Sequence, residues 1–149
     1  MDRRADVTEK EQNELKKEYL NSYKRIYKKW EALIEQEEEI RSGMAGIRGN
    51  EMNGMPKGSK KSDISDEIVR IEAILEEIEM IKTEMLKRQR MIMSSIIGVE
   101  DGVQSRILWL RYIKFKEWTD ICEEIGYSWN QTHRLHSKAL KSIEILNVG

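Results

Sequence analysis

From Thr8 to Arg41 the chain contains neither glycine nor proline, and this uninterrupted run limits the folds that are open to it. Glycine and proline are the two residues that most weaken the interior of a helix. The whole chain has one proline and is rich in glutamate, lysine, leucine and isoleucine. We therefore expect an all-α protein whose first element is a helix over residues 8–41, roughly 50 Å long at about 1.5 Å per residue.

Large side chains recur at steps of three and four in this helix and again after residue 65, which is the spacing of an apolar seam. The first seam consists of Leu15, Tyr19, Tyr23, Ile26, Trp30, Leu33 and Ile40. The second seam consists of Ile68, Ile71, Leu75, Ile78, Met85 and Ile92, and Ile74 and Ile81 widen it. Neither helix can bury its seam alone, so the two are expected to pair.

Residues 42–65 differ from both helices, because they are rich in glycine and contain the only proline, Pro56. This composition predicts a flexible loop. Two long amphipathic helices joined by one loop predict a long antiparallel hairpin over residues 8–97, which serves assembly or partner contact. The second seam is wide enough for two partners, and it therefore predicts a homodimer formed through the long helices.

A different pattern, typical of two short helices around a tight turn, occupies residues 118–136. Gly126 is expected to end the first helix, because a residue just past a helix end often needs a positive φ. Ser128 and Gln131 form a Ser-x-x-Gln capping box, which satisfies two backbone N–H groups at the start of the second helix. The pattern predicts a helix-turn-helix.

A further helix is expected just before this motif. Asp101 can cap a helix over residues 102–114, whose apolar side would pack across the helix-turn-helix. The expected result is a C-terminal three-helix domain over residues 101–146.

The second helix of the motif has a polar outward face, and no acidic residue lies between Ile125 and Ile143. Asparagine, glutamine and arginine can read base edges, while serine and lysine bind phosphate oxygens. The candidate DNA-binding residues are Ser128, Trp129, Asn130, Gln131, His133, Arg134, Ser137, Lys138 and Lys141. Because the net charge of the chain is −1, any affinity for duplex DNA must come from this local patch. The plainer alternative is a structural helical hairpin whose polar face is merely solvated.

Catalytic and metal-binding chemistry finds little support in the sequence. No carboxylate or second cysteine completes a zinc site with His133 and His136, and we expect the first to face DNA and the second to be partly packed. Cys122 is expected on the buried face of its helix, as an inert core residue. We therefore expect a non-enzyme without metal or cofactor. One cysteine and no apolar run of signal-peptide or membrane-span length favour a cytoplasmic location.

Three stretches together, residues 107–113, 118–128 and 133–140, resemble region four of bacterial sigma factors. They resemble more closely the sigma-like domain of phage and prophage regulators of the RinA and ArpU type. The shared positions are the small residue Cys122, the turn residue Gly126 and the aliphatics Ile121, Ile125 and Leu135. Two positions depart from the pattern: Thr132 stands where most members have valine or isoleucine, and Glu117 stands where a serine or threonine cap is usual.

The resemblance implies a phage-encoded, sequence-specific DNA-binding transcriptional regulator that acts at late-operon promoters in a bacterial host cell. It implies duplex DNA as the partner, with RNA polymerase as a candidate second partner. Two alternatives stay open. One is a phage DNA-packaging subunit similar to a small terminase, and the other is a protein-interaction or inhibitor module without DNA binding, which Trp129 could anchor.

Overall fold

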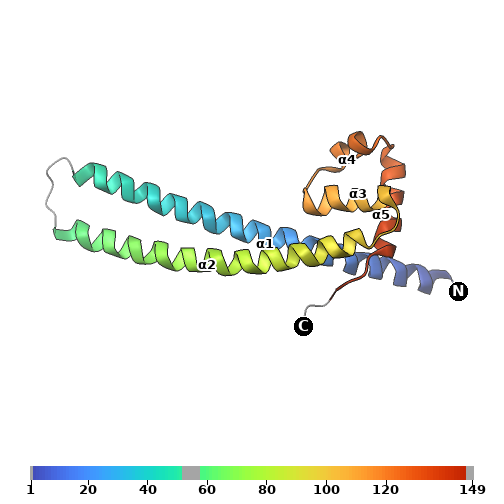
Figure 1. Ribbon diagram of the computed structural model, residues 1–149, viewed down its shortest axis with the longest axis horizontal. Helices are drawn as coiled ribbons and strands as arrows, with labels where there is room; N and C mark the ends of the chain where they lie inside the picture. Colours follow the sequence, from blue (N-terminus) through green and yellow to red (C-terminus); the bar gives the residue numbers. More distant parts are fainter. Residues whose placement is uncertain (1, 52–57, 147–149) are drawn as a thin grey trace. The chain divides into compact units, whose positions relative to one another are not determined.

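The computed structural model describes the backbone of residues 2–51 and 58–146, and the side chains of residues 8–43 and 64–146. Within those ranges the chain is helical and contains no strand. The elements in order are α1 (Asp2–Glu51), α2 (Gly58–Ile97), α3 (Gly102–Leu108), the π-helix η1 (Trp109–Ile113), α4 (Trp118–Ile125) and α5 (Trp129–Ser142) (Figure 1). The predicted all-α class, with two paired long helices followed by shorter ones, is confirmed. None of the described helices is long and apolar enough to cross a membrane.

Both long helices extend into the loop that the sequence predicts over residues 42–65. α1 continues to Glu51, and α2 already begins at Gly58. A glycine weakens a helix by only about 1 kcal/mol relative to alanine, so the helix-forming residues between the glycines are enough to continue it. The rest of the predicted loop, residues 52–57 with Pro56, lies outside the described residues.

The chain forms two compact units, and both long helices contribute to each of them. The first unit comprises residues 1–25 and 86–149, and the second comprises residues 26–85. This division differs from the expected one into a hairpin (8–97) and a separate C-terminal domain (101–146). Hydrogen bonds explain part of the difference, because the end of α2 is tied to the C-terminal region. The Ser95 hydroxyl donates to the Glu144 carbonyl at 2.7 Å, and the Ser105 hydroxyl donates to the Ile96 carbonyl at 3.0 Å.

The long helices run antiparallel within the first unit, as predicted. Tyr19 donates to the Met91 carbonyl at 3.3 Å, and its hydroxyl lies 2.6 Å from that of Ser95. One turn further along α1, the Tyr23 hydroxyl accepts a hydrogen bond from Gln89 at 3.1 Å. Partners on α2 therefore descend in number as those on α1 ascend, which defines an antiparallel pair.

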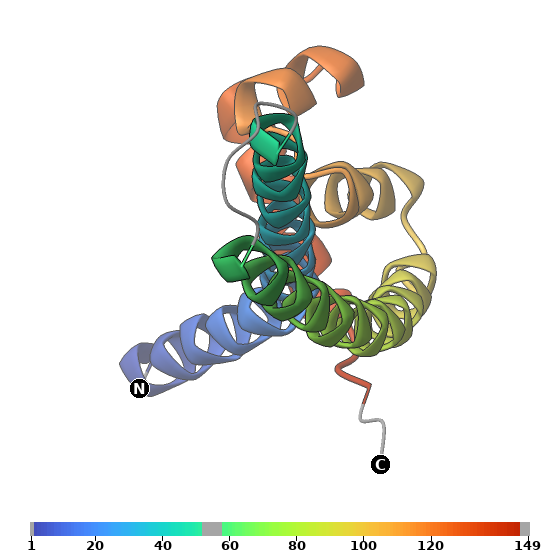
Figure 2. The same ribbon diagram turned by 90° about the vertical axis from the view of Figure 1, so that its left-hand side faces the viewer.

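The predicted seams are correct for some residues and wrong for others. Tyr19, Tyr23, Ile71, Met85 and Ile92 are buried as expected. Three seam residues are instead exposed, namely Leu15 (58%), Ile68 (41%) and Leu75 (40%), while Leu20, which belongs to neither seam, is fully buried. For α1, the reason is that a seam predicted from periodicity assumes one neighbouring helix, whereas the first part of α1 contacts α2 and also α5, which crosses it (Figures 1 and 2). There the Lys16 ammonium donates to the Lys141 carbonyl at 2.8 Å.

The C-terminal helices surround a small apolar core, in which α3 packs against α4 and α5 as predicted. Its buried members are Ile107, Leu110 and Ile121. The predicted cap is confirmed, since the Asp101 carboxylate accepts a hydrogen bond from the backbone of Gln104 at 2.9 Å. The helix expected over residues 102–114 changes character on the way: it is α-helical to Leu108 and then becomes the π-turn η1.

Candidate nucleic-acid interface

The turn between α4 and α5 has the predicted geometry. Gly126 directly follows the last residue of α4; its φ of +73° is left-handed, and its N–H donates to the Cys122 carbonyl at 3.0 Å. α5 then begins with the predicted capping box. The Ser128 hydroxyl accepts from the backbone of Gln131 at 3.2 Å, and the Gln131 side chain accepts from the backbone of Ser128 at 3.3 Å. At the start of α4, Glu117 makes no side-chain capping bond, as its poor capping chemistry suggests.

The inner face of α5 attaches this helix to the rest of the first unit. Thr132 and Ala139 are fully buried, and Leu135 is half-buried. The Thr132 hydroxyl has no hydrogen-bond partner among the described residues. A buried hydroxyl without a partner reduces stability, because its lost hydration is not replaced.

The outer face of α5 carries an exposed polar stripe, which we define as Asn130, Arg134, Ser137 and Lys138. Their spacing of four, three and one residues places them along one side of a helix. Neither Arg134 nor Lys138 forms an ion pair with any residue that the structure describes. Ser128 is exposed at the start of the helix, and Trp129 beside it is 52% exposed.

Three other candidate DNA-binding residues are already engaged within the protein. Gln131 has its side-chain oxygen in the capping box. The Lys141 ammonium lies 3.5 Å from a carboxylate oxygen of Glu9 on α1, and both side chains are exposed. His133 is half-buried instead of facing outward, because its ring packs between two indole rings. The centroid distances are 4.5 Å to Trp118 and 4.4 Å to Trp129.

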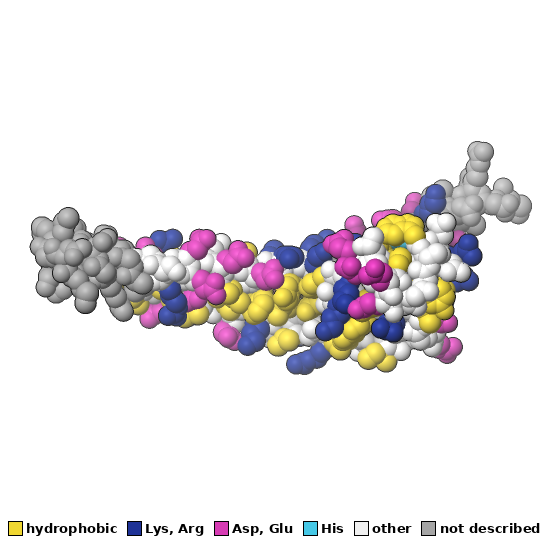
Figure 3. Space-filling model, turned by 90° about the horizontal axis from the view of Figure 1, so that it is seen from above, with side chains coloured by type: hydrophobic (Ala, Val, Ile, Leu, Met, Phe, Trp, Pro, Cys, Tyr) yellow, Lys and Arg dark blue, Asp and Glu magenta, His cyan; other side chains and the backbone are white. Residues whose placement is uncertain are grey.

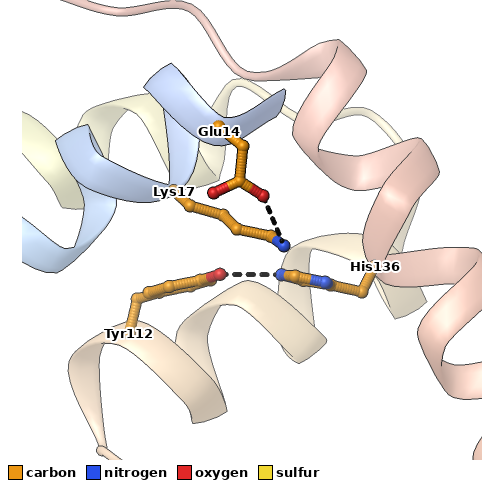
Figure 4. A network of polar contacts seen from close by, with 4 residues as sticks. All are labelled: Glu14, Lys17, Tyr112 and His136. Atoms are coloured by element: carbon orange, nitrogen blue, oxygen red, sulfur yellow. Dashed lines mark hydrogen bonds and ion pairs between the residues drawn. The ribbon is translucent and has the colours of Figure 1, made fainter. Parts of the chain in front are cut away.

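A buried polar pair joins η1 to the inner side of α5, and sequence reasoning missed it. The Tyr112 hydroxyl and His136 Nε2 are 2.8 Å apart, and His136 is only 5% exposed (Figure 4). Burial, followed by the charge of Lys17, lowers the pKa of His136 to about 3, and burial raises the pKa of Tyr112. Both groups are therefore neutral at physiological pH. The spacing of Thr132, His136 and Ala139 is the one available signal, since it places the histidine on the buried face.

The described part of the chain contains no candidate metal site. No three histidine, cysteine, aspartate or glutamate side chains there converge on a point that could hold a metal ion. Cys122 is a free thiol and is half-buried on α4. The candidate functional features of the first unit are the polar stripe on α5 and the buried polar groups on its inner side.

Among known protein families, one family model matches the chain. A family model described as "Protein of unknown function (DUF1492)" matches residues 49–144. No curated protein and no solved structure matches the chain. The matched span contains α2 and all the shorter helices, and it leaves out most of α1.

Proposed function

This chain belongs to the DUF1492 family, and we propose that it binds duplex DNA through the polar stripe on α5. One observation carries the proposal: a helix-turn-helix whose second helix presents on its exposed face an arginine and a lysine that form no ion pair with any described residue. From Gly126 to Ser142 the chain has three cations and no acid, in a protein whose net charge is −1. Such a local excess of positive charge attracts the phosphate backbone.

The stripe suits a helix that enters the major groove with its N-terminus first. Asn130 is then nearest to the bases, where its amide can pair with adenine. Arg134 follows one turn later and can contact guanine, while Ser137 and Lys138 reach phosphate oxygens. Lys141 contributes less, because Glu9 already neutralises part of its charge.

The finer role that we propose is control of transcription at phage late promoters, with RNA polymerase as a second partner. The resemblance to sigma region four supports this role. Exposed aromatic residues also favour a second candidate, a module that binds a protein: Trp129 is 52% exposed and Tyr127 is 39% exposed. Large exposed aromatic side chains are frequent anchors of protein interfaces.

We also propose that the long helices form a homodimer. In the second unit, Val69 and Met80 on α2 are 62% and 71% exposed. On the face shown in Figure 3, hydrophobic side chains run along the pair of long helices between charged ones. Sedimentation equilibrium of the intact protein and of Val69→Glu tests the proposal. A dimer that the substitution dissociates would support it, and a monomeric wild-type protein at micromolar concentration would exclude it.

The DNA experiment starts with a selection from random duplexes, because the preferred sequence has to be found first. Fluorescence anisotropy then compares the selected duplex with a scrambled one, from low to physiological salt. Arg134→Ala should reduce the preference for the selected duplex by about tenfold, since a base contact contributes roughly 1–3 kcal/mol. Lys138→Ala should weaken binding to both duplexes equally and lower the salt slope by about one.

Lys82→Ala is the matched control, because Lys82 is an exposed lysine on α2 in the second unit. It should leave binding to both duplexes unchanged. If the folded protein binds neither duplex at low salt, the DNA proposal fails and the protein-binding module replaces it. Ring-shaped assemblies that select packaging sites over promoters would instead identify a DNA-packaging subunit.

A further inference from the structure

A small cavity in the first unit lies between α1, η1, α4 and α5, behind the polar stripe. It has a volume of about 210 Å³ and is lined by Lys17, Asn21, Arg111, Tyr112, Trp118, His133 and His136. All seven side chains carry a polar group, none of them is acidic, and two of them, Lys17 and Arg111, are basic. This lining disfavours an apolar ligand or a cation and favours an anion.

The two cations reach the cavity from different elements and are only partly neutralised. Lys17 on α1 lies 3.2 Å from a carboxylate oxygen of Glu14, whose side chain is 70% exposed (Figure 4). Arg111 in η1 donates to the Lys116 carbonyl at 2.9 Å and lies over the ring of Trp118 at 5.0 Å. It forms no ion pair with a described carboxylate, so its charge is available to a ligand.

The positive charge of the cavity affects the pKa values of the two histidines. After burial, the charges of Arg111 and Lys17 lower the pKa of both His133 and His136. Both rings are therefore neutral at physiological pH, and the positive charge of the cavity comes from Lys17 and Arg111. In addition, Nε2 of His133 is buried and has no hydrogen-bond partner among the described residues. A buried nitrogen of this kind usually has a partner, such as a water molecule or a ligand.

An unusual backbone places Arg111 and Tyr112 at the cavity. Both belong to the π-turn η1, which the hydrogen bond from Lys114 to the Trp109 carbonyl at 3.1 Å closes. π-turns are rare within helices and occur often at functional sites. The turn is followed by Phe115 with a φ of +57°, a left-handed conformation that a bulky residue rarely adopts. The fold therefore holds an unfavourable backbone conformation at Phe115, shortly after the π-turn that carries these two side chains.

We propose that this cavity binds a phosphate group. A phosphate offers only acceptor oxygens, in a tetrahedral arrangement that suits donors converging from several helices. The Lys17 ammonium, the Asn21 amide and the remaining guanidinium donors of Arg111 provide them. The phosphate can come from free phosphate or a phosphomonoester, or from a DNA backbone. The site does not depend on whether the stripe on α5 reads DNA.

The test uses nuclear magnetic resonance of the full-length protein, because the chain has only two histidines, and both line the cavity. Inorganic phosphate is titrated against sodium chloride at equal ionic strength, while the imidazole resonances are followed. Phosphate should shift both rings with saturation and raise their pKa values, since a bound anion favours the imidazolium. Chloride should produce neither change.

Charge variants at the cavity and elsewhere on α1 test whether phosphate binds at this cavity. Lys17→Gln should weaken phosphate binding by about tenfold, because it removes a charged hydrogen-bond donor. Lys10→Gln, the same change at an exposed lysine on the same helix, should leave binding unchanged. Glu14→Gln should tighten binding by about threefold, because the carboxylate competes for Lys17. Its control, Glu11→Gln, should have no effect.

A parallel titration with a short DNA duplex identifies the source of the phosphate. If a short duplex shifts the same imidazole resonances and Lys17→Gln weakens both ligands, the backbone supplies the phosphate. If Lys17→Gln weakens inorganic phosphate alone, the ligand is free phosphate or a phosphomonoester. The proposal is overturned if neither phosphate nor duplex shifts the rings more than chloride does. It is equally overturned if Lys17→Gln and Lys10→Gln bind phosphate alike.

Discussion

Replacement of His136 with glutamine should make the protein less sensitive to acid, and the size of the effect follows from the burial of this ring. An ordinary histidine in the unfolded chain has a pKa of 6.5, whereas burial lowers the pKa of His136 in the folded protein to about 3. Between these two values the unfolded state binds a proton that the folded state does not bind. Stability therefore rises with pH through this window and is lost as the pH falls below about 6.5.

The magnitude can be worked out for a drop from about pH 7.5 to about pH 5. Over that range this histidine alone should cost about 2 kcal/mol of unfolding free energy, because each unit of pH below 6.5 contributes up to about 1.4 kcal/mol. Burial and the charge of Arg111 also lower the pKa of His133, so that residue acts in the same direction. The carboxylates contribute equally to the pH dependence of unfolding in wild type and variant. Their contribution therefore cancels when the two proteins are compared.

Urea unfolding at the two pH values provides the measurement. Glutamine cannot titrate, and its amide can still bond to the Tyr112 hydroxyl, so His136→Gln should keep enough stability to be measured. The loss on acidification should be about 2 kcal/mol smaller in the variant than in wild type. An equal loss in both proteins would refute the reasoning, since His136 would then not be held neutral by its surroundings.

Three further substitutions test the helix-turn-helix itself by thermal or urea unfolding. Thr132→Val should stabilise the protein by about 1 kcal/mol, because it replaces a buried, unpaired hydroxyl with a methyl group. A destabilised variant would show that the hydroxyl has a partner. Gly126→Ala should destabilise by about 1 kcal/mol through its positive φ alone, since no atom lies within 4 Å of the added Cβ. Gly102→Ala, with equally open surroundings but no positive φ, should not destabilise, and equal effects would contradict this explanation. Ser128→Ala should cost about 1 kcal/mol by removing the cap of α5, and an unchanged midpoint would show that water replaces the cap.

The sequence by itself determined the features that depend on near neighbours. The left-handed turn at Gly126, the capping box of Ser128 and Gln131, and the Asp101 cap were all predictable. In each case the interacting groups lie within a few residues of one another in the sequence. Their spacing along the chain is therefore enough to predict the local geometry. The all-α class followed for the same reason, because helix propensity and apolar periodicity are local properties. The proposed DNA-binding stripe rests on such local periodicity as well.

Only the tertiary structure decided which polar residues are free and which are engaged. Lys141 pairs with Glu9, and Lys16 reaches the Lys141 carbonyl across a separation of 125 residues. The environment of His136 likewise depends on Tyr112 and on Lys17 of α1. These contacts exist because α1 and α5 cross in the first unit, and the periodicity of one helix carries no information about a helix that crosses it. The cavity between α1, η1, α4 and α5 has the same physical origin.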